Sequence, residues 1–166
     1  MKINNKDKNI VLIGFMGSGK TSVGKRLSLV LKREFIDTDD FIEKREGMTI
    51  NEIFKEKGEE EFRKIERELY KRFSTPKKKI IATGGGVIKN SANIANLKKG
   101  GVIVYLKSSP EKIAQNLKFD NTRPILQVDD KEAKIRELLA QREPFYNKYA
   151  EITIDVSNYD IDHTVD

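Results

Sequence analysis

A glycine-rich motif near the N-terminus has the residue types and spacing that bind polyphosphates. Residues 14–21 read Gly-Phe-Met-Gly-Ser-Gly-Lys-Thr, the pattern G-x-x-x-x-G-K-T, and they follow the apolar run 10–13. The glycines let the backbone turn with its N–H groups pointing inward. Lys20 can reach the β- and γ-phosphates of a nucleotide, and the Thr21 hydroxyl can coordinate Mg²⁺. The motif therefore predicts binding of a nucleoside triphosphate. The expected contacts are Gly17, Ser18, Gly19, Lys20, Thr21 and Ser22.

Three acids could serve a metal ion or an acceptor substrate. Asp37, Asp39 and Asp40 directly follow a short apolar run. If that run is a strand of a parallel sheet, its carboxyl end lies at the edge where ligands bind. Asp37 and Asp39 are two residues apart, so in extended geometry both should project to one side. One of the two can serve Mg²⁺ and the other can face the acceptor, whereas Asp40 is expected to cap a helix beginning near Phe41.

Three consecutive glycines, Gly84-Gly85-Gly86, follow the apolar run 79–83. Glycine has no side chain to pack and loses more chain entropy on folding than any other residue. A purely structural role is therefore a poor explanation for three in a row. We expect the backbone to approach a ligand closely here, at the same sheet edge as the acids.

A P-loop alone is compatible with a kinase, a GTPase or a motor-type ATPase. A GTPase should carry an N-K-x-D motif after a later strand, but the best candidate, residues 147–150, reads Asn-Lys-Tyr-Ala and lacks the acid. A motor-type ATPase should have a long apolar strand that ends in Asp or Asp-Glu. The long strands here end in Thr83-Gly84 and Leu106-Lys107 instead. Both classes are therefore disfavoured, which leaves a kinase.

Apolar runs of strand length alternate with helical patterns, and this alternation predicts a parallel α/β sheet. Strands are expected at about 9–14, 35–37, 79–83, 101–106 and 151–156, the last as an edge strand. Helical spacing predicts one buried stripe of Val23, Leu27, Val30 and Leu31, and another of Phe62, Ile65, Leu69 and Phe73. Helix boundaries are predicted at Thr49, Gly58 and Ser109-Pro110, and a further helix near 131–141. Residues 119–130 have no convincing period.

The composition bounds the class of protein. The chain has 166 residues, 35% of them charged, and no apolar run near the roughly 20 residues of a membrane span. It has no cysteine, which excludes disulfides and thiolate metal sites. The net charge of +6 comes from interleaved charges, with one dense run at 77–79 that suits a solvated loop. We expect a cytoplasmic monomer that binds small anionic substrates and neither nucleic acid nor membranes.

The motifs, taken together and in order, resemble those of the shikimate kinase family. They are Gly-Phe-Met-Gly-Ser-Gly-Lys-Thr, Asp-Thr-Asp, Glu-Phe-Arg-Lys-Ile-Glu at 61–66, Thr-Gly-Gly-Gly, Arg123-Pro124 and Arg-Glu-Pro-Phe-Tyr at 142–146. The resemblance covers about residues 8–157. It implies a single domain over residues 1–166 with a nucleoside-monophosphate-kinase-like fold. That fold has three α/β/α layers, a five-stranded parallel sheet and a mobile lid at about 119–130.

The activity that the resemblance implies is transfer of the ATP γ-phosphoryl group to the 3-hydroxyl of shikimate, with one Mg²⁺, in the route to aromatic amino acids. It assigns Arg63 and Arg142 to the shikimate carboxylate, which suits the planar fork of Arg. It assigns Asp39 and the Gly85 N–H to the ring hydroxyls, where Asp39 orients the attacking hydroxyl and can deprotonate it. Glu66, on the same helical face as Arg63, should hold the Arg63 guanidinium.

The resemblance also implies roles on the nucleotide side. Arg123 in the lid would bind ATP and stabilise the transferring charge, together with Lys20. Thr21 would coordinate the Mg²⁺, and Asp37 would reach it through water. The family usually has an Arg several residues before the lid Arg-Pro, packed on the adenine. Here that stretch reads Gln-Asn-Leu-Lys at 115–118, so Lys118 is the nearest cation.

The C-terminal helix that follows the last strand in the family is expected to be missing after residue 166. Two other functions stay open at this point. A gluconate or nucleotide kinase would share the P-loop, and gluconate is also a carboxylate, so the arginines alone do not exclude it. A catalytically silent homologue would bind a nucleotide or a protein partner. The combined motifs favour shikimate, and the intact Lys20, Asp39 and arginines argue against a silent homologue.

Overall fold

The computed structural model describes residues 6–118, 126 and 129–157. The strands are β1 (Asn9–Ile13), β2 (Phe35–Asp37), β3 (Ile80–Ala82), β4 (Gly101–Lys107) and β5 (Ile152–Asp155). The helices are α1 (Lys20–Leu31), α2 (Thr38–Glu46), α3 (Ile50–Lys57), α4 (Glu59–Arg72), the short 3₁₀ helix η1 (Val87–Lys89), α5 (Ser91–Gly100), α6 (Pro110–Asn116) and α7 (Lys131–Tyr149). Within these described residues, no helix is both long enough and apolar enough to span a membrane.

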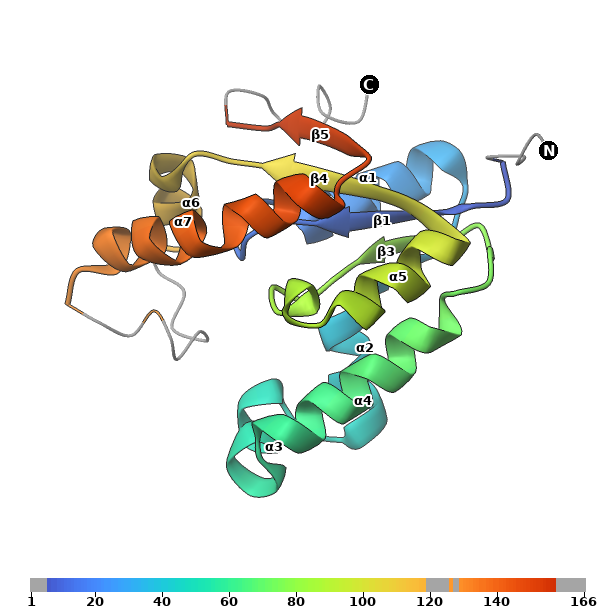
Figure 1. Ribbon diagram of the computed structural model, residues 1–166, viewed down its shortest axis with the longest axis horizontal. Coiled ribbons are helices and arrows are strands. Elements are labelled where there is room, and N and C mark those ends of the chain that lie inside the picture. The colour runs from blue at the N-terminus through green and yellow to red at the C-terminus, as the bar shows by residue number, and fades with distance from the viewer. Residues whose placement is uncertain (1–5, 119–125, 127–128, 158–166) are drawn as a thin grey trace.

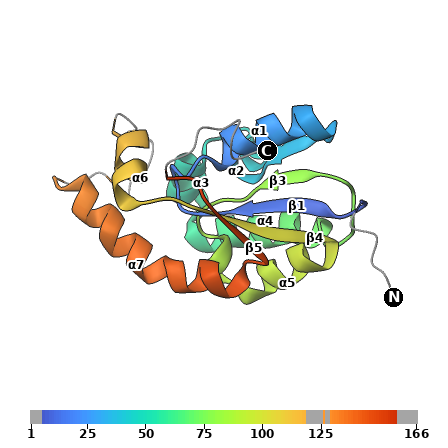
Figure 2. The same cartoon turned by 90° about the horizontal axis from the view of Figure 1, so that it is seen from above.

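The strands form one five-stranded sheet in the order β2-β3-β1-β4-β5, and every neighbouring pair is parallel. Figures 1 and 2 show α1 on one side of this sheet and α4, α5 and α7 on the other. The predicted three-layer α/β/α fold with its P-loop after the first strand is therefore confirmed. All five predicted strands form, and β5 lies at an edge as expected.

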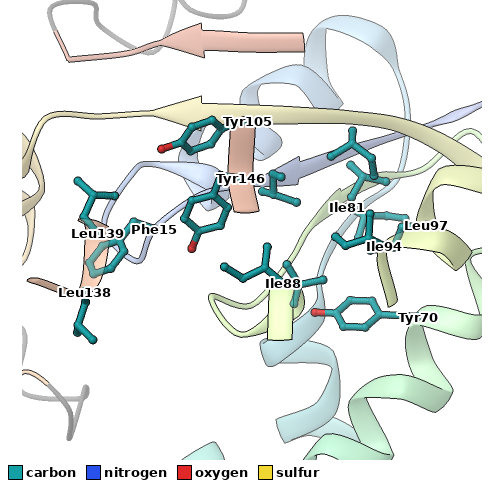
Figure 3. Close-up of a cluster of buried hydrophobic side chains, with 14 of the residues drawn as sticks. Phe15, Tyr70, Ile81, Ile88, Ile94, Leu97, Tyr105, Leu138, Leu139 and Tyr146 are labelled. Atoms are coloured by element: carbon teal, nitrogen blue, oxygen red, sulfur yellow. The ribbon is translucent and has the colours of Figure 1, made fainter. Parts of the chain in front are cut away.

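Side chains on the strands alternate between two hydrophobic clusters, as the pleat of a strand requires. Val11 and Ile13 of β1 belong to the larger cluster, to which α4, α5 and α7 contribute and part of which Figure 3 shows. Leu12, between them, packs on the opposite face with Val23 of α1. The burial of both faces explains why the strands read as nearly continuous apolar runs.

The predicted inward stripe of α1 is only partly correct. Val23 is buried, and Leu27 packs against the smaller cluster. Val30 and Leu31, however, are 55% and 44% exposed, as is the neighbouring Leu29 at 72%. Helical spacing determines which residues share a face, but that face is buried only where another element covers it. None of the described elements covers the last turn of α1.

The last helix is longer than predicted. α7 continues from Lys131 through Pro144 to Tyr149, whereas the pattern predicted an end near residue 141. Proline inside a helix removes one hydrogen bond and costs about 3 kcal/mol. Packing offsets this cost, because the fully buried Tyr146 stacks on Tyr105 of β4 with ring centroids 4.9 Å apart (Figure 3). The prediction was wrong because tertiary packing outweighs a local helix breaker here.

Three predicted helix boundaries are confirmed by their capping contacts. Thr49 Oγ1 accepts a hydrogen bond from the Glu52 backbone N–H at 3.1 Å and caps α3. Gly58, with φ of 88°, separates α3 from α4. Ser109 caps α6 through the Lys112 N–H. These local signals also determine where α4 begins, and α4 carries Arg63.

Candidate active site

The P-loop connects β1 to α1 and brings most of the predicted nucleotide contacts together. Gly17 has φ of 78°, and a Cβ there would lie 2.7 Å from Leu117 Cγ, so only glycine fits. The Lys20 ammonium group donates to the carbonyl oxygens of Gly14 and Phe15 at 2.6 and 3.1 Å, so its side chain lies over the loop. A cavity of about 200 Å³ lies beside the loop. Its lining includes Gly17, Gly19, Lys20, Thr21 and Ser22.

Ser18, another predicted nucleotide contact, has a buried side chain. The Ser18 side chain does not line this cavity, and its Oγ has no hydrogen-bond partner among the described residues. Its backbone N–H donates to the Phe15 carbonyl at 3.1 Å. This hydrogen bond helps to close the turn of the P-loop.

Asp37 links the P-loop to α2. Its Oδ2 accepts a hydrogen bond from Thr21 Oγ1 at 2.8 Å, and its Oδ1 accepts one from the Asp40 backbone N–H at 3.1 Å. Asp37 is therefore the N-cap of α2, which begins at Thr38 and not near Phe41. The prediction that Asp40 caps this helix is wrong, since an N-cap carboxylate serves the N–H groups two or three residues later. Asp40 instead forms an exposed ion pair with Lys44.

Asp39 lies in the first turn of α2, so the extended geometry assumed for Asp37 and Asp39 is wrong. The two acids nevertheless line the same P-loop cavity. Asp39 also lines a second, larger cavity of about 330 Å³. Both cavities include Gly84 and Gly85. Asp39 therefore lies where the phosphate-binding loop and a second binding space meet, which is where an acceptor hydroxyl must be for phosphoryl transfer.

Arg63 of α4 faces the larger cavity and is held by two acids. One guanidinium nitrogen donates to Glu66 Oε1 at 3.0 Å, and the other terminal nitrogen lies 3.5 Å from Glu59 Oε1. The predicted contact between Arg63 and Glu66 is therefore confirmed. Glu66 is 1% exposed, and its burial raises the pKa of its carboxyl, while the nearby Arg63 charge lowers it.

Arg142 approaches the same cavity from α7. Its guanidinium carbon lies 5.4 Å from the centre of the Phe15 ring, a cation–π contact. Arg142 is an interior helical residue, because α7 continues past it. One terminal nitrogen of Arg142 and the Nε of Arg63 are buried without a hydrogen-bond partner in the described part of the chain. Both arginines line this cavity, so two positive charges face the space in which an anionic ligand could bind.

The glycines at 84–86, called here the triglycine loop, make room for these side chains. A Cβ on Gly86 would lie 2.3 Å from an Arg63 guanidinium nitrogen, and one on Gly84 would lie 2.7 Å from Asp39 Oδ1. A Cβ on Gly85 would meet only Arg142, at an ordinary 3.5 Å. The prediction was a close approach to a ligand. The structure adds a second reason for glycine at two of these positions, which the sequence could not show. Side chains of the site itself lie against Gly84 and Gly86.

Two charged residues of this site were not predicted. Lys89 of η1 lines the larger cavity and lies 3.4 Å from Glu59, which lies between Lys89 and Arg63. The spacing of four residues between Glu59 and Arg63 was a usable signal, because it places both on one helical face. No pattern in the sequence pointed to Lys89. Its place depends on how η1 follows the triglycine loop.

Some predictions fall outside the described residues. Arg123, most of the lid at about 119–130, and the C-terminal residues 158–166 are among them. Lys118, the nearest cation to the lid, is exposed just after α6. Two residues earlier, the Asn116 side-chain amide donates to the Gly17 carbonyl at 2.8 Å, so the end of α6 contacts the P-loop directly.

Comparisons with known proteins agree with this geometry. A family model described as "Shikimate kinase" matches residues 16–166. A shikimate kinase from Caldanaerobacter subterraneus subsp. tengcongensis is 51% identical over 159 residues, which cover 96% of this chain and 92% of that protein. The structure of shikimate kinase from Acinetobacter baumannii in complex with shikimate matches with a TM-score of 0.90 and 39% identity, over 97% of this chain and 90% of that one.

A gluconokinase from Sinorhizobium meliloti is a more distant structural neighbour. It matches with a TM-score of 0.55 and 16% identity, over 98% of this chain and 89% of that one, so the likeness is of fold alone. The matches to shikimate kinases are far closer in sequence and cover nearly the whole chain. The chain therefore belongs to the shikimate kinase family and is an ATP-dependent kinase.

Proposed function

We propose that this protein transfers the γ-phosphoryl group of ATP to the 3-hydroxyl of shikimate, yielding shikimate 3-phosphate and ADP. One observation carries the choice of acceptor. The half-buried Arg63 and Arg142 both line a cavity that meets the P-loop cavity at Asp39. A cyclic carboxylate with several hydroxyls matches this set of two cations and one acid. The product is an intermediate of aromatic amino acid synthesis.

The acceptor is held at its two ends. The shikimate carboxylate accepts charge-assisted hydrogen bonds from Arg63 and Arg142, whose planar donors fit a carboxylate. The ring hydroxyls contact Asp39 and the Gly85 backbone N–H. Asp39 orients the attacking hydroxyl toward the γ-phosphorus and accepts its proton as the new P–O bond forms.

The nucleotide is held by the P-loop. The backbone N–H groups of Gly17, Ser18 and Gly19, with Thr21 and Ser22 at the start of α1, cradle the phosphates. Lys20 exchanges its contacts with the loop carbonyls for contacts with phosphate oxygens, and so stabilises the negative charge of the transition state. We assign the same stabilising role to Arg123 from the lid side, on the basis of the family motif.

The residues beside the P-loop fit a magnesium ion. Thr21 Oγ1 and Asp37 Oδ2 lie 2.8 Å apart, and both are the hard oxygen donors that Mg²⁺ prefers. Thr21 would hold the ion directly and Asp37 through water. When bound, Mg²⁺ supplies positive charge that neutralises the β- and γ-phosphate oxygens.

ADP release tests this function. Purified protein is mixed with Mg-ATP and one acceptor at a time, namely shikimate, gluconate or a nucleoside monophosphate. We expect ADP release with shikimate far above that with the other acceptors or with none, and loss of activity with EDTA that added Mg²⁺ restores. Equal release with gluconate would refute the assigned acceptor. Nucleotide binding without any turnover would identify a silent homologue.

The remaining expectations on organisation belong to the same proposal. We infer a single kinase domain over residues 1–166 that acts as a monomer in the cytoplasm, with no nucleic acid or membrane partner. Residues 119–130 are inferred to act as a lid that closes over both substrates. Size-exclusion chromatography with light scattering tests the monomer. Amide exchange across 119–130, with and without both substrates, tests closure, and equal protection in both states would refute it.

A further inference from the structure

Tyr70 of α4 is fully buried, and its hydroxyl lies where three elements of the acceptor site meet. The hydroxyl oxygen is 3.4 Å from Thr38 Oγ1 at the start of α2 and 3.4 Å from the Gly84 backbone nitrogen. The Gly84 N–H also donates to Thr38 Oγ1, at 3.1 Å. Figure 3 shows the phenol side chain reaching from α4 toward Ile88, with its oxygen at the inner end. These contacts define a buried polar triad of Tyr70, Thr38 and Gly84.

Two members of the triad directly precede residues of the proposed acceptor site. Thr38 is followed by Asp39, which orients the attacking hydroxyl, and Gly84 is followed by Gly85, which offers its backbone N–H. A Cβ on Gly84 would lie 2.7 Å from Asp39 Oδ1, so α2 and the triglycine loop are already in close contact here. A shift of either element by a fraction of an ångström would change the relative placement of Asp39 and the Gly85 N–H.

The third member, Tyr70, connects the triad to the residues that hold the acceptor carboxylate. Tyr70 lies four residues after Glu66 on the same face of α4, and Glu66 holds Arg63 at 3.0 Å. Burial raises the pKa of Tyr70 well above its ordinary value, and the negative charges of Glu66 and Asp39 raise it further. The hydroxyl therefore stays neutral, so it can serve as a hydrogen-bonding group but not as a base.

We propose that the Tyr70 hydroxyl is a positioning group for the acceptor site, which ties the start of α2 to the triglycine loop through Thr38 Oγ1 and the Gly84 N–H. It acts through its neighbours, since Tyr70 lines neither the P-loop cavity nor the larger cavity. The proposal rests on the proposed function, because Asp39 and Gly85 owe their roles to it. A phenol at this position thus affects turnover of shikimate without touching shikimate.

Removing the hydroxyl alone tests this role. Tyr70→Phe keeps the buried ring, and we expect kcat/KM for shikimate to fall about five- to fifty-fold, with most of the loss in kcat, while the Kd for ATP stays within about twofold. Tyr105→Phe is the matched control, because Tyr105 is also a buried tyrosine but lies on β4 with its ring stacked on another tyrosine. We expect this control to keep the kinetic constants of the wild type.

The second arm concerns Thr38. Thr38→Val removes the oxygen that accepts from Gly84, whereas Thr38→Ser keeps it, so the serine variant should retain most of the activity that the valine variant loses. The Tyr70→Phe and Thr38→Val effects on kcat/KM should not multiply in the double variant, since both hydroxyls serve one N–H group. Multiplicative effects would overturn the proposal. So would a Tyr70→Phe protein with a lower Tm but unchanged kinetic constants.

A third measurement separates this proposal from the proposed function. Amide hydrogen exchange of Gly84 and Gly85 in the protein without substrates should be at least tenfold faster in Tyr70→Phe than in the wild type and in Tyr105→Phe. This readout does not depend on turnover of shikimate. If the wild type fails to phosphorylate shikimate but the exchange still changes, the acceptor assignment fails and the positioning contact stands. Unchanged exchange refutes the positioning contact, whatever the activity.

Discussion

Replacing Gly86 by Ala should weaken shikimate binding by displacing Arg63. The backbone of Gly86 has φ of −89° and ψ of 6°, outside the left-handed region that favours glycine, so the fold should tolerate alanine there. The new Cβ would lie 2.3 Å from one Arg63 guanidinium nitrogen and 2.9 Å from both the guanidinium carbon and the other terminal nitrogen. Since ordinary contacts begin near 3.4 Å, the guanidinium group must move by roughly 1 Å.

A movement of that size removes the hydrogen-bond geometry that Arg63 offers to a carboxylate. A hydrogen bond to a charged group contributes about 1.5–3 kcal/mol, which corresponds to a change of about 10- to 150-fold in affinity. We therefore expect the shikimate KM and Kd to rise by that factor. The ATP Kd should not change, because Gly86 and Arg63 do not line the P-loop cavity.

Calorimetric titration with shikimate and with ATP, together with steady-state kinetics, gives the required constants. A double-mutant cycle with Arg63→Ala is the control for the mechanism. If Gly86→Ala acts through Arg63, it should weaken shikimate binding in the wild-type background but add little once the Arg63 side chain is gone. The same loss in both backgrounds, or unchanged shikimate affinity in Gly86→Ala, would refute this reasoning.

Three further variants test other parts of the site. Asp39→Asn keeps the shape but removes the charge that orients the hydroxyl, so kcat should collapse while calorimetry still detects ATP binding; near-normal turnover would exclude Asp39 from the mechanism. Arg142→Ala should raise the shikimate KM about 10- to 150-fold with nucleotide affinity retained, and loss of ATP affinity instead would reassign Arg142. Glu66→Gln should remove a pH dependence of stability. Because the folded-state pKa of Glu66 lies above 4.5, its proton binds more tightly in the folded state, and its contribution to the free energy of unfolding falls as pH rises from about 4.5 through that raised pKa. Urea unfolding at a series of pH values should show this fall in the wild type relative to the Gln variant, and parallel curves would contradict it.

The sequence alone predicted those features whose residues lie close together along the chain. The P-loop could be predicted because its glycines, Lys20 and Thr21 act within one continuous segment, and the strands because both faces of the sheet are buried. The caps at Thr49 and Ser109 are likewise contacts between residues three apart. The pairing of Arg63 with Glu66 followed from helical spacing, once the family resemblance had marked Arg63 as more than a solvated charge.

Only the tertiary structure decided the properties that depend on what lies against a segment. The same helical spacing buries Val23 but leaves Val30 exposed, because burial depends on the element that covers a face. α7 passes through Pro144 because Tyr146 gains its packing from a distant strand. Gly84 and Gly86 leave the space that the side chains of Asp39 and Arg63 occupy, and those side chains come from α2 and α4. The spacing of residues along the chain does not predict these contacts, because each one joins residues that are distant in the sequence and meet only in the folded protein.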